Sequence, residues 1–157
     1  MLLRKRQAAK FILQMNILLT IGVLVCCPLG ACRFASEKSA SQKAAIQFHE
    51  LFNAGRYKEI YEQADENFKS SASEAEAVNV FFLVQRKLGS IEKSVLIRWD
   101  VSLSNKGTLV KLIFRTHFSK ADAEEHFAYF IKDGIAKLGD YKIFSPSLTD
   151  AGKSATP

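Results

Sequence analysis

Cysteine is absent from most of this 157-residue chain, because Cys26, Cys27 and Cys32 are the only three and none follows position 32. The remainder therefore has no disulfide framework, and burial of an apolar core must hold it together. Glycine and proline are scarce, at eight and three residues, while the hydrophobic fraction is 48% and the charged fraction is 24%. This composition excludes a collagen-like or mostly disordered protein, and the length allows one domain at most.

A surplus of basic residues is also missing from most of the chain, although the net charge is +6. Arg4, Lys5, Arg6 and Lys10 all precede the first apolar run, and beyond residues 1–31 the basic and acidic side chains almost balance. Binding to nucleic acid requires basic groups that neutralise phosphates. We therefore expect no nucleic-acid partner.

A long uninterrupted hydrophobic run is missing as well. Residues 1–31 consist of a basic start, an apolar stretch centred on residues 17–25 and a small-residue end, which is the layout of a secretory signal. Gln14 and Asn16 interrupt the apolar stretch and Pro28 closes it, so the stretch is too short and too weak for a permanent membrane span. We predict a cleaved signal peptide over residues 1–31.

The four residues Leu29-Gly30-Ala31-Cys32 follow the apolar stretch directly and resemble the lipobox of bacterial lipoproteins. This resemblance implies that Cys32 is the first mature residue and carries a diacylglycerol on its sulfur and an acyl chain such as palmitate on its amino group. Several acyl chains give a stable membrane anchor. Since Arg33 rather than an aspartate follows, the resemblance also implies the outer membrane, facing the periplasm, in a host with two membranes. The alternative is an uncleaved anchor with three ordinary cysteines.

Polar segments flank the predicted domain. We expect the lipidated cysteine and a tether over residues 32–41, an α+β domain over residues 42–145 and a flexible C-terminal tail over residues 146–157. Within the domain, apolar residues at helical spacing predict helices at residues 44–52, 57–64 and 73–88. The third helix has the capping-box residues Ser73 and Glu76 at its start and Gly89 as its stop.

After Gly89 the apolar period changes to two, which predicts β-strands. Four strands are expected in antiparallel succession, with Asp133-Gly134 in the last hairpin and a bulge at Gly139. The registers that bring the apolar partners onto one face pair Trp99 with Leu112, Ile97 with Phe114, Phe118 with Glu125, and Tyr129 with Leu138.

Three N-terminal helices packed on one face of a four-stranded antiparallel meander sheet make an α+β fold. The order of these elements, the segment from Phe52 to Tyr57 between the first two helices, and Arg86-Lys87-Leu88-Gly89 at the end of the third resemble the nuclear transport factor 2-like (cystatin-like) superfold. More narrowly, residues 42–145 are similar to bacterial lipoproteins of unknown function built on that fold. The resemblance implies an architecture and leaves the activity open.

Proteins of that superfold often have a pocket between helices and sheet, and some, such as ketosteroid-isomerase-like enzymes, place an acid–base carboxylate in it. We expect no such carboxylate on the inward face here: Asp100 points outward opposite Lys111, and Asp140 turns inward only if the bulge is not at Gly139. Aromatic residues could instead line a pocket for a small apolar ligand, with plain core as the alternative. These candidates are Tyr57, Tyr61, Trp99, Tyr129 and Tyr141.

The outer face of the predicted sheet mixes apolar side chains with positive charge, which is unusual for a solvated face and favours an interface with a second copy or another envelope protein. The interface candidates are Leu96, Arg98, Ile113, Arg115 and Phe130. On the same face the predicted register sets His117 opposite His126, a spacing that suits zinc or copper. A third ligand is lacking unless Glu124 or Glu125 supplies it, so we expect no metal site.

Taken together, these patterns predict a lipid-anchored binding or accessory protein of the cell envelope, without a cofactor and without assigned catalytic residues. It would act through the outer sheet face or through a pocket between helices and sheet. The alternative is an isomerase- or dehydratase-like enzyme of the same superfold, which requires an open pocket with an inward carboxylate or histidine.

Overall fold

A computed structural model describes residues 29–104 and 107–149, with side chains from Phe34 onward except that of Ser104. The chain divides into two compact units, Met1–Arg33 and Phe34–Pro157, and the following description concerns the second. The predicted signal peptide falls almost wholly outside the described residues, as does the side chain of Cys32. None of the described helices is long and apolar enough to cross a membrane.

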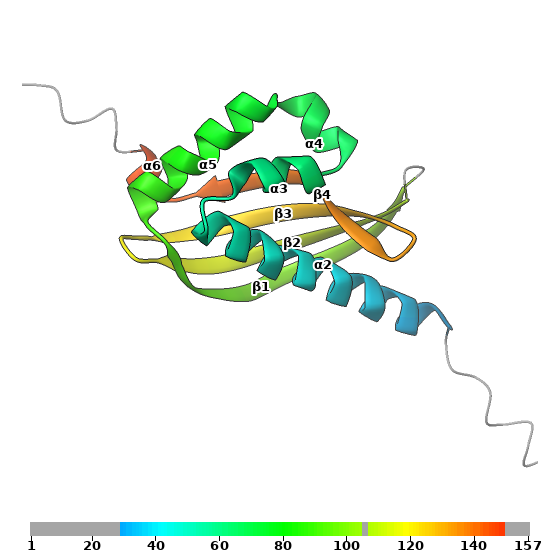
Figure 1. Cartoon of the computed structure of the whole chain (residues 1–157). Coiled ribbons are helices and arrows are strands. Elements are labelled where there is room, and N and C mark those ends of the chain that lie inside the picture. The colour runs from blue at the N-terminus through cyan, green and yellow to red at the C-terminus, as the bar shows by residue number, and fades with distance from the viewer. Residues whose placement is uncertain (1–28, 105–106, 150–157) are drawn as a thin grey trace, which may run out of the picture. The chain divides into compact units, whose positions relative to one another are not determined.

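The second unit has an α+β fold, with helices over one face of an antiparallel sheet (Figure 1). The sheet order is β1-β2-β3-β4, so each strand pairs with the next one along the chain, as predicted for a meander. The helices are α2 (Leu29–Asn53), α3 (Tyr57–Gln63), α4 (Glu66–Ser71), α5 (Glu74–Leu88) and α6 (Pro146–Thr149). The strands are β1 (Ile91–Ser104), β2 (Gly107–Phe118), β3 (Asp122–Lys132) and β4 (Ile135–Phe144).

The capping signals predicted for α5 are confirmed at both ends. The Ser73 backbone N–H donates to Glu76 Oε2 (2.8 Å) and the Glu76 N–H donates to Ser73 Oγ (3.3 Å), which satisfies two donors at the helix start. At the other end Gly89 has φ of +88°, and a Cβ there would fall 2.0 Å from Ser119 Oγ. Only glycine therefore fits this stop without rearrangement.

The packed domain is longer at both ends than predicted. Residues 34–41, expected to be a tether, belong to α2, and Glu37 and Ser41 are buried against the domain. The expected tail begins with α6, whose Leu148 packs against the core. The short helix α4 was also missed, because Phe68 is its single buried residue and gives no periodic signal.

The register of β1 with β2 is as predicted near Trp99, which lies opposite Leu112, but a bulge between Leu96 and Arg98 changes it further along. As a result Leu96, rather than Ile97, lies opposite Phe114 and packs against the core. The prediction that Leu96 lies on the outer face is therefore wrong. The predicted bulge at Gly139 is confirmed, since Tyr129 pairs with Leu138 and the register shifts between Ala128 and Tyr129.

The predicted register of β2 with β3 is wrong by four residues, because Glu125 lies opposite Phe114 instead of Phe118. The cause is a tight turn: the Phe118 N–H donates to the Ala121 carbonyl (2.9 Å), so β3 begins at Asp122. A shift of an even number of residues leaves the apolar side chains of β2 and β3 on their predicted face. It changes only the partners that the side chains meet.

The space between helices and sheet is filled mainly by aromatic rings. Phe48 on α2 lies at the centre, with ring centroids of Phe81, Phe127 and Tyr141 at 5.6, 5.1 and 4.9 Å. Such contacts stabilise beyond the burial of area alone. This packing leaves little free volume on the helix-facing side of the sheet.

Candidate functional site

A carboxylate lies inside the core on the helix-facing side of the sheet. Glu125, on β3, is completely buried, which contradicts the expectation that the inward face carries no acidic residue. The alternation of Phe127, Tyr129 and Ile131 carries the signal that was missed, because extending the inward positions by one step reaches Glu125.

Three side chains from three different elements contact the Glu125 carboxylate. The Tyr141 hydroxyl, on β4, donates to Oε1 at 2.8 Å, and the Thr116 hydroxyl, on β2, donates to Oε2 at 2.5 Å. His49 Nε2, on α2, lies 3.0 Å from Oε2. Ser94 Oγ, on β1, is 2.9 Å from Thr116 Oγ1, so the polar network includes one residue from every strand and one from α2.

Burial of a carboxylate is costly unless the charge is paired and its oxygens are hydrogen-bonded. Both conditions are met at Glu125, since each oxygen accepts a hydrogen bond and the imidazole of His49 is a potential cation. Hydrogen bonds to charged groups contribute about 1.5–3 kcal/mol each. The network thus fastens α2 to the sheet.

The environment of Glu125 holds two tyrosines in their neutral form. Burial raises the pKa of Tyr129 well above its ordinary value, and the nearby negative charge of Glu125 raises it further. The same two causes, burial first, raise the pKa of Tyr141 well above its ordinary value. Tyr141 therefore stays a hydrogen-bond donor to the carboxylate at any pH at which the fold persists.

A small cavity of about 50 Å³ lies between α2, α3 and the end of the sheet, and Tyr129 lines it with Ala44, Gln47, Phe48, Leu51, Ile60, Gln63, Ala136 and Leu138. The Tyr129 hydroxyl is buried and finds no hydrogen-bond partner among the described residues. Pockets for small-molecule ligands measure about 300–1,000 Å³, whereas a single water needs only about 10–15 Å³. This cavity is of the size that water fills, and neither Glu125 nor His49 lines it.

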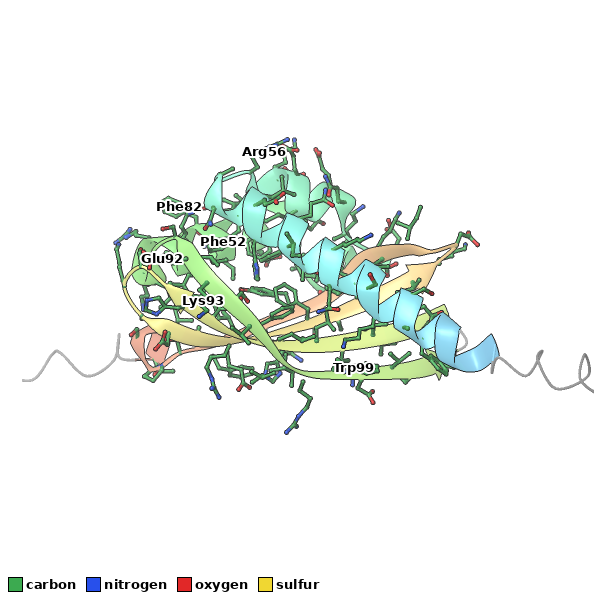
Figure 2. The ribbon with its side chains drawn as sticks, turned by 90° about the horizontal axis from the view of Figure 1, so that it is seen from below. Phe52, Arg56, Phe82, Glu92, Lys93 and Trp99 are labelled. Atoms are coloured by element: carbon green, nitrogen blue, oxygen red, sulfur yellow. The ribbon has the colours of Figure 1, made fainter. Side chains whose placement is uncertain are left out.

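The five aromatic pocket candidates do not form one wall. Tyr129 alone lines the cavity. The Tyr57 hydroxyl donates to Gln85, and the Tyr61 hydroxyl donates to the Ala72 carbonyl (3.2 Å), so both serve the packing of the helices. Trp99 is 46% exposed at the edge strand, where Lys38 Nζ lies 4.6 Å from its ring centroid (Figure 2).

The outer face of the sheet carries unpaired positive charge. Lys111 and Arg115 lie two residues to either side of Ile113 on β2, and Arg98 lies opposite Ile113 on β1. These cations have no ion-pair partner within the described residues 34–104 and 107–149. Three acidic groups of the same face lie against a lysine or histidine: Asp122 beside His117 (2.6 Å), Glu124 beside His126 (2.6 Å) and Asp140 beside Lys142 (3.0 Å), whereas Asp100 has no such contact in the described structure.

Apolar side chains lie among these cations. Val95, opposite Arg115, is 48% exposed, and Ile97 is 43% exposed. Phe130 and Ile113 are half-buried. A hollow of about 190 Å³ opens beside them, lined by Lys111, Leu112, Ile113, His126, Phe127, Ala128, Asp140 and Lys142. Asp100 and Lys111 lie opposite each other, as predicted, although no ion pair joins them in the described structure.

The histidine pair that was predicted to lie directly opposite across β2 and β3 is not formed. His117 lies opposite Asp122 and His126 lies opposite Ile113, so the two imidazoles are not paired across the strands. Each binds a carboxylate, and within the described residues no three potential ligands cluster as a metal site.

A second exposed apolar surface lies on α5 and was missed in the sequence. Val80, Phe82 and Leu83 are 49%, 51% and 42% exposed, and Figure 2 labels Phe82. The signal is the continuous apolar run from Phe81 to Val84: a helix that buries Phe81 and Val84 must expose the two residues between them.

No protein-family model matches this chain, and the search of curated proteins found no match.

Proposed function

We propose that this protein is a lipid-anchored accessory component of a bacterial cell envelope that acts by binding a partner through its outer sheet face. We further propose that its domain belongs to the nuclear transport factor 2-like (cystatin-like) superfold, which is consistent with the observed order of helices and meander strands. The anchor rests on the signal layout of residues 1–31 and the lipobox-like Leu29–Cys32.

The observation that carries the binding function is the set of three unpaired cations around Ile113, namely Arg98, Lys111 and Arg115. A solvated sheet face is usually polar, whereas here exposed Val95 and Ile97 lie beside the positive charge. Arginine with neighbouring apolar groups is favoured at interfaces. The partner that suits this surface is an envelope protein presenting an acidic patch with an apolar centre.

Photocrosslinking in the cells that make the protein tests this proposal. The photoreactive residue p-benzoylphenylalanine replaces Val95, and illumination should join the chain to one partner. Arg98→Ala/Arg115→Ala should abolish the crosslink, whereas Lys43→Ala/Lys58→Ala removes the same charge from the helical side and should retain it. Absence of a crosslink, or equal loss in both variants, would contradict the proposed binding surface.

The anchor is tested separately by membrane fractionation of Cys32→Ala. Loss of the thiol should abolish lipidation and leave the signal peptide uncleaved. The mass of the variant should then show no attached acyl chains. Identical maturation and partitioning of the variant would show that Cys32 carries no lipid, without affecting the test of the sheet face.

An isomerase- or dehydratase-like activity is the second candidate, because Glu125 and His49 supply a buried carboxylate and imidazole in contact. Proton transfer requires that a substrate reach the carboxylate within hydrogen-bond distance. Glu125 is fully buried with both oxygens engaged, and the nearby cavity of about 50 Å³ is not lined by it. This geometry favours binding over catalysis.

A further inference from the structure

Four exposed residues form a straight stripe along α5. Glu76, Val80, Leu83 and Lys87 follow each other at spacings of four, three and four, and all are exposed. At 100° per residue they fall within about 60° of the helix circumference. This is the spacing of a seam along which two helices pack side by side.

The charges at the two ends of the stripe are opposite, so the stripe is complementary to an antiparallel copy of itself. Acidic Glu76 stands at one end, basic Lys87 at the other, and Val80 and Leu83, 49% and 42% exposed, lie between them. From these features we infer that α5 pairs antiparallel with α5 of a second copy about a two-fold axis. In that arrangement Val80 meets Leu83 of the other chain, and Glu76 meets Lys87 of the other chain, twice over.

Both charged ends are available for such contacts. Glu76 uses Oε2 to cap its own helix through Ser73, which leaves Oε1 for a cation. Lys87 Nζ donates to the Leu148 carbonyl at 3.3 Å and has no ion-pair partner in the part of the chain that the structure describes. Both side chains therefore carry charge that a second copy could neutralise.

The charges of the stripe favour an antiparallel second copy over a parallel copy or a membrane surface. A parallel pairing would set Glu76 against Glu76 and Lys87 against Lys87, and like charges in apposition are unfavourable. An anionic membrane surface would repel the acidic end of the same stripe. One helix pair is a small interface, so we expect a weak dimer.

Sedimentation equilibrium of the full chain in non-ionic detergent with a thiol reductant tests the inference. The wild type should show a concentration-dependent monomer–dimer equilibrium. Leu83→Lys should raise the dissociation constant at least about tenfold, whereas Ile46→Lys, at a more exposed apolar position on α2, should leave it unchanged. Circular dichroism confirms that both variants are folded.

A charge exchange identifies the pairing itself. Lys87→Glu places two acidic residues on each stripe and Glu76→Lys places two basic ones, so each variant alone should dimerise more weakly than the wild type. Their mixture restores both complementary contacts and should form a heterodimer. A monomeric wild type at millimolar concentration, equal effects of Leu83→Lys and Ile46→Lys, or a mixture no tighter than its parts would each overturn the inference. These outcomes leave the proposed sheet-face function untouched, since that surface is not altered.

Discussion

His49 Nε2 on α2 lies 3.0 Å from Glu125 Oε2 on β3, and this contact joins the helical layer to the centre of the sheet. The side chain of His49 is only 12% exposed and that of Glu125 is fully buried. Neither group can be removed without leaving the other in an apolar environment. The pair therefore stabilises the packing of α2 on the sheet, and its loss should lower the free energy of unfolding of the whole domain.

We expect Glu125→Ala to lower the free energy of unfolding by about 3–5 kcal/mol, because His49, Thr116 and Tyr141 lose their shared acceptor inside the core. His49→Ala should cost about 1–3 kcal/mol. Urea unfolding of both variants and of the double variant gives their coupling energy, expected at about 1–3 kcal/mol. Additive effects would mean that the two side chains do not stabilise each other.

Tyr129 and Tyr141 should respond oppositely to loss of the hydroxyl. Tyr141→Phe removes a donor to Glu125 and should cost about 1–2 kcal/mol. Tyr129→Phe removes a buried hydroxyl that has no partner within the described residues, so it should be neutral or stabilise by up to about 1 kcal/mol. Thermal unfolding compares them directly. A clear loss of stability in Tyr129→Phe would place ordered water on that hydroxyl.

Alkaline pH should unfold the domain as its tyrosines ionise. The pKa values of Tyr129 and Tyr141 are raised in the folded state, so above about pH 10 the unfolded chain releases protons that the folded chain retains. Stability should therefore be unaffected by these groups below pH 10 and fall as pH rises beyond it. Absorbance at 295 nm should show both tyrosines ionising only together with the unfolding seen by circular dichroism. Ionisation of all four tyrosines in the folded state would contradict this.

Gly139 is required at the β4 bulge by the close approach of Phe130. A Cβ at position 139 would lie 2.5 Å from Phe130 Cδ2, which is closer than side chains pack. Gly139→Ala should cost about 1–3 kcal/mol through this overlap. Phe130→Ala should relieve it, so that the double variant is more stable than the sum of the single effects predicts. Simple additivity in urea unfolding would exclude the clash as the cause.

Sequence patterns among residues close together in the chain predicted most of the fold. The capping box at Ser73, the stop at Gly89 and the bulge at Gly139 were all predictable, because each depends on residues close together in the chain. The β2–β3 register was not, since the tight turn before Asp122 leaves no glycine or proline signal and apolar partners match almost equally well after a shift of four residues. The bulge that turns Leu96 inward likewise has no sequence mark.

The candidate site was predictable only in part. Arg98, Ile113, Arg115 and Phe130 lie on the outer face as expected from alternation, and that face needs no register to be recognised. Glu125 was missed because a charged residue at the end of an apolar run is ordinarily placed at the surface. Its burial depends on His49, Thr116 and Tyr141, which lie far apart in the chain.

We propose that the outer sheet face, and not the buried Glu125 network, carries the function. The most direct measurement is the yield of the crosslink from position 95 in cells producing either Glu125→Gln or Arg98→Ala/Arg115→Ala at equal levels. We predict that Glu125→Gln retains most of the wild-type yield and that the double arginine variant loses it. Loss of the crosslink in Glu125→Gln, with an unchanged yield in the double arginine variant, would contradict this and would indicate that the Glu125 network carries the function.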